Sequence, residues 1–245
     1  MTEAKWLACG NSVLMLSQID DTTNYRKLRL FTFACCRRCW DQLGEDSQTA
    51  IDVAEQFVEE KVGEAELLDA WRNTDYYLPH PFDDSGFVGY RRGFIGRGAS
   101  LSYAAWVAGR ASDIAWSSAR KDDASLIARC AAASRAYSGI ERIGGKRSEW
   151  RRFEAEELAA QADLLRDILG TRLFRLTNFP TTWRTSTVVA LASQMYESRD
   201  FGAMPILADA LQDAGCDSAD VLDHCRGEGP HVRGCWVVDL VLGKE

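Results

Sequence analysis

Residues 26–43 read RKLRLFTFACCRRCWDQL. Apolar positions in this stretch recur every three or four residues, beginning with Leu28 and Phe31, which is the period of one face of an α-helix. Further apolar side chains widen that face until little but arginine is left for solvent. We therefore expect a central, mostly buried helix here, with other helices packed around it.

The same helical period continues on both sides of this stretch. It is clearest in residues 51–58, 149–169 and 187–199, and capping residues or glycines flank these segments. Residues 230–242 also fit a helix, although CWVVDLVL within them would fit a buried strand. The sequence predicts an all-α fold, a compact bundle of about nine helices.

Two irregular segments interrupt the helical pattern. Residues 73–98 contain two prolines, five glycines and six aromatic residues in no helical period, so we expect a long protruding loop. Residues 171–185 form the second irregular segment. We expect a single helical domain over residues 1–245, with two subdomains, 1–170 and 186–245, as the alternative organisation.

The overall composition is ordinary for a soluble globular chain. Its 245 residues are 46% hydrophobic and 27% charged, and the formal net charge is −7. An acidic chain disfavours the broad positive surface that binds nucleic acid without sequence preference. No apolar run approaches the roughly 18 residues that span a bilayer, and the N-terminus lacks the pattern of a signal peptide. We expect a cytoplasmic protein whose partner is another protein, with neither nucleic acid nor membrane among its partners.

Eight cysteines raise the question of disulfides. A reducing compartment removes the opportunity for disulfides, and a chain long enough to bury a core removes the need. Cys35, Cys36 and Cys130 lie among apolar or alanine neighbours, where free cysteine packs as a small hydrophobic residue. We therefore expect most of the thiols to serve packing.

The block from Met204 to the C-terminus holds two of the three histidines and three of the eight cysteines. A zinc site needs about four ligands, commonly supplied as two close pairs. On a helix, His231 and Cys235 would share a face because they are four residues apart. The candidate metal ligands are Cys225, His231 and Cys235, with His224 and Cys216 in reserve and Cys36-x-x-Cys39 as a second pair.

Packing alone is the competing interpretation of these residues, and under it the protein has no cofactor. Cys36 and Cys39 lie inside an apolar helical pattern without the tight turn that usually presents a CxxC pair to zinc. Cys235 lies between Gly234 and Trp236, where a small buried residue also packs well. The sequence leaves a choice between no cofactor and zinc.

The same block contains the residue types of a thiol enzyme. Cys225 stands beside His224, and Asp239 could orient a histidine. Neighbours in sequence point in different directions on a helix, however, so His224 does not simply activate Cys225. The glycines of RRGFIGRGAS, residues 91–100, lack the preceding strand and the lysine of phosphate-binding loops. No motif in the chain specifies a reaction.

Four phrases of the sequence resemble an expanded family of uncharacterised bacterial paralogues. They are KLRLFTFACCRRCW near the N-terminus, LLRDILG, and, towards the C-terminus, TVVALASQMYESRDFGAMPILADALQDAGCD and HCRGEGPHVRGCWVVDLVLGK. The resemblance covers both ends of the chain and implies a stand-alone helical module with a variable centre and no established activity. The chain departs from the family at Cys39, where an aliphatic residue is usual, and after Gly170, where NPFRPV is usual.

The sequence contains no motif that specifies a reaction. The leading functional hypothesis is therefore a protein-interaction or regulatory helical module without catalytic activity. An enzyme with a Cys/His site in the C-terminal block is the first alternative, and a zinc-stabilised nucleic-acid-associated protein is the second. A polar pocket converging on His224, Cys225 or His231 would favour the enzyme, whereas an exposed apolar groove would favour the interaction module.

Overall fold

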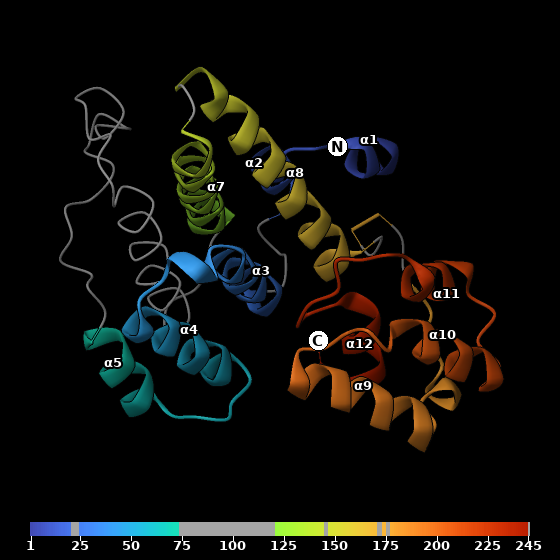
Figure 1. Ribbon diagram of the computed structural model, residues 1–245. Helices are drawn as coiled ribbons and strands as arrows, with labels where there is room; N and C mark the ends of the chain where they lie inside the picture. Colours follow the sequence, from blue (N-terminus) through green and yellow to red (C-terminus); the bar gives the residue numbers. More distant parts are fainter. Residues whose placement is uncertain (21–24, 74–120, 145–146, 171–172, 175–176, 245) are drawn as a thin grey trace. The chain divides into compact units, whose positions relative to one another are not determined.

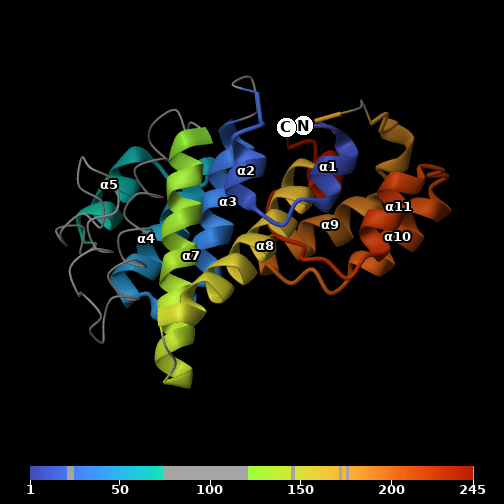
Figure 2. The same cartoon turned by 90° about the horizontal axis from the view of Figure 1, so that it is seen from above.

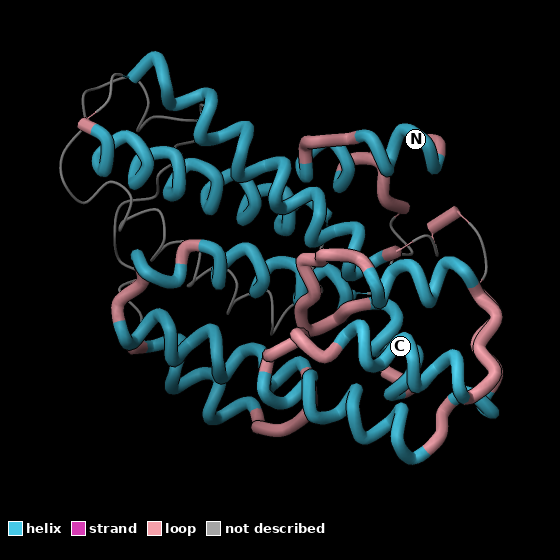
Figure 3. The backbone as a smooth tube through the Cα atoms, turned by 45° about the vertical axis from the view of Figure 1, so that its right-hand side comes forward, coloured by secondary structure: helices cyan, strands magenta, loops and turns pink. Residues whose placement is uncertain are grey.

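The structure, a computed structural model, describes residues 1–20, 25–73, 121–144, 147–170, 173–174 and 177–244. These residues form helices and the loops between them. These residues form eleven α-helices, nine of them with seven or more residues, and no strand occurs among them (Figure 3). The prediction of an all-α fold is confirmed. The predicted loop 73–98 lies outside the described residues from position 74 onward, as does the glycine segment 91–100. None of the described helices is both long enough and apolar enough to cross a membrane.

The chain divides into two compact units. Unit 1 comprises residues 1–8 and the chain from Asp163 onward, and unit 2 comprises residues 9–162. The division falls inside one continuous helix, α8 (Trp150–Leu169), so this helix contributes residues to both units. No proline or glycine marks this point in the sequence, because a unit is defined by what its residues pack against.

Unit 2 is built around the helix that residues 26–43 predicted. This helix, α3 (Tyr25–Arg38), buries most of its surface, including Phe31. It packs against α4 (Glu45–Val58) and α7 (Lys121–Ile143), and α7 is shown beside α3 in Figure 2. The other elements of unit 2 are α2 (Ser12–Leu16), which contacts α7, α5 (Glu64–Arg72), which contacts α4, the first part of α8, and the 3₁₀ turns Trp40–Gln42 and Arg147–Glu149.

Small side chains allow α7 to approach its neighbours closely. Its buried residues are mostly alanines. A Cβ at Gly139 would lie 2.7 Å from the ring of Phe153, so the missing side chain makes room for α8. A partly buried ion pair also holds α8, since Arg38 donates hydrogen bonds of 2.6 and 2.9 Å to the two carboxylate oxygens of Glu157.

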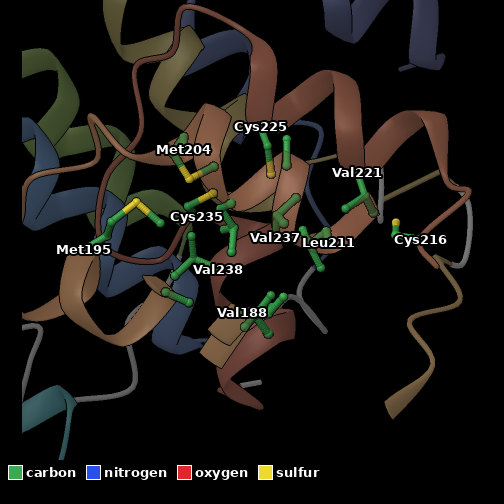
Figure 4. Close-up of a cluster of buried hydrophobic side chains, with 14 of the residues drawn as sticks. Val188, Met195, Met204, Leu211, Cys216, Val221, Cys225, Cys235, Val237 and Val238 are labelled. Atoms are coloured by element: carbon green, nitrogen blue, oxygen red, sulfur yellow. The ribbon is translucent and has the colours of Figure 1, made fainter. Parts of the chain in front are cut away.

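Unit 1 is a group of short helices around an apolar core. Its elements are α1 (Glu3–Ala8), the end of α8, a 3₁₀ turn (Thr181–Trp183), α9 (Ser186–Ser198), α10 (Met204–Asp213), α11 (Ala219–Arg226) and α12 (Trp236–Leu242). α10 contacts α9 and α11, and α12 contacts the same two helices (Figure 1). Val188, Leu211 and Val237 are among the side chains that fill the core between them (Figure 4).

The helix α12 is shorter than the one predicted over residues 230–242. Residues 231–235 form a loop, and Cys235 is the N-cap residue of the helix. Gly234 has a φ of +91°, which a right-handed helix does not accommodate. The strand interpretation of CWVVDLVL is also wrong, because its last seven residues are helical and buried on nearly every side.

Candidate metal centre

Four side chains of unit 1 meet at one point. Each offers one ligand atom, and these atoms all lie within 4.8 Å of one another. The four residues are Asp167, His224, His231 and Cys235. Asp167 comes from the last turn of α8, His224 from the last turn of α11, and the other two from the loop that leads into α12.

The carboxylate of Asp167 contacts both imidazoles. Its Oδ1 lies 2.8 Å from Nδ1 of His231 and 3.2 Å from Nε2 of His224. The same Nε2 of His224 lies 3.2 Å from Sγ of Cys235. Around a tetrahedral zinc ion with bonds of about 2.0 to 2.3 Å, neighbouring ligand atoms are about 3.3 to 3.8 Å apart. The three short separations would have to lengthen slightly, and any that approach 4.8 Å would have to shorten, to admit an ion.

The four side chains are largely shielded from water. The exposed fraction is 2% for the side chain of Asp167, 8% for that of His231 and 18% for that of His224. Cys235 is fully buried. Buried polar groups are costly unless they are partnered, and here the partners are chiefly one another.

Close packing of an aromatic ring on a glycine brings the end of α8 to the start of α12. Gly170 follows α8 with a φ of +61°, and a Cβ there would lie 2.6 Å from Cγ of Trp236. The ring of Trp236 in turn lies 5.2 Å from the ring of His224, measured between centroids. Asp167 and Cys235 are therefore adjacent because the indole occupies the space that a side chain at position 170 would need.

Backbone groups orient two of the four side chains. The N–H of Val232 donates a hydrogen bond of 2.9 Å to Oδ2 of Asp167, which leaves Oδ1 facing the histidines. Nε2 of His231 lies 3.4 Å from the carbonyl oxygen of Gly227. Contacts of this kind behind the ligands fix ring and carboxylate orientation at metal sites.

The loop that carries His231 and Cys235 is anchored to the end of α9. Arg233 donates hydrogen bonds to the carbonyl oxygens of Tyr196, at 2.8 Å, and Glu197, at 3.1 Å. The last carbonyls of a helix have no partner within the helix, and a cation at that end satisfies them. Arg233 thus fixes the loop at a position between its two candidate ligands, His231 and Cys235.

The electrostatic environment couples the carboxylate to the imidazoles. Burial raises the pKa of Asp167, but hydrogen bonds and charge interactions with His224 and His231 outweigh burial and leave this pKa below its ordinary value. Burial lowers the pKa of His231, but Asp167 outweighs that effect and the pKa is raised. For Cys235, burial and the nearby Asp167 both raise the pKa of the thiol well above its ordinary value.

The structure brings together two of the three predicted metal ligands. His231 and Cys235 converge, but they do so from a loop, so the helical spacing used to pair them does not apply. Cys225 is not one of the four converging residues, and it lies in the apolar core of unit 1 (Figure 4). Burial raises the pKa of the Cys225 thiol to about 12.

The remaining sequence candidates are buried elsewhere. Cys216 belongs to the apolar core of unit 1, and Asp239 is buried within α12. Cys36 and Cys39 belong to unit 2, where burial raises the pKa of the Cys39 thiol to about 12. In the part of the chain that the structure describes, the converging group includes none of these four residues.

Sequence reasoning missed Asp167 altogether and held His224 only in reserve. One local signal for Asp167 exists: it lies in the last turn of α8, where the helix dipole disfavours an anion. A buried carboxylate at such a position needs a cationic partner.

Two imidazole nitrogens, one carboxylate oxygen and one sulfur form a donor set that suits zinc, which accepts all three ligand types. Four protein ligands are also the number that a closed, structural zinc site uses. Comparisons of the chain with protein-family models, with curated proteins and with solved structures gave no match.

Proposed function

We propose that this protein binds one zinc ion through the four converging side chains and that the ion holds unit 1 in its folded form. The observation that carries the proposal is the approach of four ligand atoms to within 4.8 Å of one another. They come from separate segments of the chain, so the ion would join α8, α11 and the loop before α12. Because the protein supplies all four ligands, the ion's role is structural.

Contacts at His224 support a shared ion over a set of hydrogen bonds. Its Nε2 lies 3.2 Å from Oδ1 of Asp167 and 3.2 Å from Sγ of Cys235. One imidazole nitrogen carries at most one hydrogen, so it cannot donate a full hydrogen bond to both atoms. An ion placed among the three atoms would satisfy all of them at once.

The same contacts disfavour a thiol enzyme. In a Cys/His/Asp arrangement, one ring nitrogen of the histidine contacts the thiol and the other contacts the orienting carboxylate. Here Asp167 and Cys235 both face Nε2 of His224. Cys235 is also fully buried, which keeps it from reaching a substrate.

A zinc-stabilised unit is compatible with an interaction or regulatory module that has no catalytic activity, since a structural ion supplies rigidity and no reaction. Under this proposal the partner is another protein. A nucleic-acid-associated protein stabilised by zinc would contain the same ion, so zinc binding does not distinguish it from an interaction module. A DNA and RNA binding assay at low salt distinguishes the two. We expect no binding in that assay.

Metal content tests the zinc proposal directly. The protein is expressed with zinc in the medium, purified without chelators and analysed for metal by mass spectrometry. We expect one zinc ion per chain in the natural protein, and almost none in Cys235→Ser. Cys225→Ala is the matched control, because Cys225 is an equally buried thiol in the same core but lies outside the converging group.

The control should retain one zinc ion per chain, with helical content checked by circular dichroism. A natural protein that stays free of zinc after incubation with excess Zn²⁺ would overturn the proposal. So would a folded Cys235→Ser variant that retains the full zinc content.

A further inference from the structure

The imidazole of His231 has an acceptor at each of its nitrogens. Nδ1 faces Oδ1 of Asp167 at 2.8 Å, and Nε2 faces the carbonyl oxygen of Gly227 at 3.4 Å. A carbonyl oxygen only accepts hydrogen bonds, so this contact is a hydrogen bond only in the tautomer that carries the hydrogen on Nε2. The atom left to bind an ion is Nδ1, which lies on the side of the converging carboxylate.

His224 faces the same point with Nε2, whereas His231 faces it with Nδ1. Its Nε2 is the atom that lies 3.2 Å from both Asp167 Oδ1 and Cys235 Sγ. The two rings pack edge to face, with centroids 4.9 Å apart. The two rings therefore approach the point where the four ligand atoms meet in different orientations.

A glycine sits directly against the ring of His231. Gly229 has a φ of +87°, and a Cβ there would lie 3.0 Å from the backbone N of His231 and 3.3 Å from its ring atom Cδ2. Contacts of that length require the neighbour to shift by a few tenths of an ångström. A side chain at position 229 would therefore press on the ring that must present Nδ1 and shift it slightly.

We propose that the ion is bound through Nε2 of His224 but through Nδ1 of His231, and that Gly229 is the positioning residue that permits the second mode. This inference rests on the proposed zinc site. Nδ1 is the ring nitrogen nearer the backbone, so this mode brings the ion close to the main chain around residue 231. The absence of a side chain at Gly229 leaves the ring free to take that orientation.

Nitrogen NMR of the zinc-bound protein tests the coordination mode. With ¹⁵N-labelled histidine, only three residues contribute signals, because the chain has three histidines. We expect metal-bound Nδ1 and protonated Nε2 for His231, and the reverse for His224. Zinc bound with His231 coordinating through Nε2 would overturn this inference and leave the proposed zinc site standing. A spectrum that zinc does not change would overturn both.

A pair of glycine variants tests the positioning role. Gly215 has a φ of +90°, close to that of Gly229, but a Cβ at Gly215 meets nothing within 4 Å. Gly215→Ala thus carries the same backbone strain without the contact to His231. Co²⁺ alone serves as the probe, because its absorption bands report both affinity and the geometry of the ligands.

We expect Gly229→Ala to weaken Co²⁺ binding about 10- to 100-fold and to alter the absorption bands, as changes behind a ligand do at metal sites. Gly215→Ala should bind Co²⁺ as the natural protein does. Thermal unfolding of the metal-free proteins should show a loss in both variants because both strain the backbone, whereas only Gly229→Ala should lose Co²⁺ affinity, which separates strain from positioning. An equal loss of affinity in both variants, or none in Gly229→Ala, would overturn the positioning role.

Discussion

Asp167 and His231 face each other at 2.8 Å, although 64 residues separate them along the chain. The carboxylate is buried, and its other oxygen is held by the N–H of Val232. A buried charge that loses its partner is strongly destabilising, so each member of this pair depends on the other. The contact joins the end of α8 to the loop before α12.

Asp167→Ala should abolish zinc binding and lower the free energy of unfolding by about 3 to 5 kcal/mol, because it leaves buried imidazoles without their carboxylate. Urea denaturation of the zinc-loaded protein measures this. Asp163→Ala is the control, since Asp163 lies one turn earlier in α8 with a side chain that is 53% exposed and pairs with Arg166. The control should cost less than about 1 kcal/mol. Equal losses in the two variants would contradict the role given to Asp167.

Chelation of the bound ion should lower the unfolding temperature of the protein. Added Zn²⁺ or Co²⁺ should restore it, whereas Mg²⁺ and Ca²⁺ should not, because these hard ions prefer oxygen ligands to imidazole and thiolate. Differential scanning fluorimetry provides the measurement. Restoration by Mg²⁺ would show that the ion is held by carboxylates and not by the four side chains described above.

Thiol reactivity should be confined to one residue in the folded protein. Seven of the eight cysteines are buried and Cys9 is partly exposed. With a pKa of about 12, Cys225 is ionised in about one molecule in ten thousand at pH 8, and raising the pH from 7 to 9 leaves it almost wholly protonated.

Ellman's reagent at pH 8 should therefore titrate about one thiol in the native protein and all eight after unfolding in guanidinium. Cys9→Ser should remove the native signal. Rapid reaction of two or more thiols without unfolding would be incompatible with the burial of the other cysteines.

Gly170→Ala should destabilise the protein by about 3 kcal/mol, because a left-handed φ costs an alanine about 1 to 2 kcal/mol and displacement of a packed ring costs a similar amount. The ring is that of Trp236, which a Cβ at Gly170 would meet at 2.6 Å. Gly144 has a φ of +58°, and an added Cβ there would meet nothing within 4 Å. Gly144→Ala should therefore lower the free energy of unfolding by only about 1 kcal/mol. Urea denaturation of both variants distinguishes the two contributions.

Glu157→Gln should destabilise unit 2 by about 3 kcal/mol, because the buried carboxylate accepts two hydrogen bonds from Arg38. Glu156→Gln is the matched control on the same helix, since the side chain of Glu156 is 61% exposed. We expect a change below about 0.5 kcal/mol for the control, measured by thermal unfolding. A small effect in both variants would mean that the Arg38 ion pair adds little to stability.

Helical periodicity was sufficient to predict the fold class and the buried position of α3. It was not sufficient for α12, where the apolar run from Trp236 fits both a helix and a strand. The start of that helix depends on the left-handed conformation of Gly234, which a hydrophobic pattern does not reveal. The division inside α8 also lacks a local signal, because it depends on contacts between distant segments.

The candidate site could be predicted only in part. His231 and Cys235 were found because they are close in sequence, but Asp167 reaches them through the packing of Gly170 on Trp236. Such a long-range contact leaves no spacing in the sequence. The weak signal that remained was an anion in the last turn of a helix, and it becomes meaningful only when its partners are known.

The distance in sequence between Asp167 and His231 gives a bound ion an effect beyond its local contacts. All eight cysteines are free, so no disulfide limits the unfolded chain. An ion that joins two residues 64 positions apart would act as a removable cross-link, and closing a loop of that length restricts the unfolded chain by about 4 kcal/mol. Zinc supply would then set how tightly α9 and α10, which lie within that loop, are tethered.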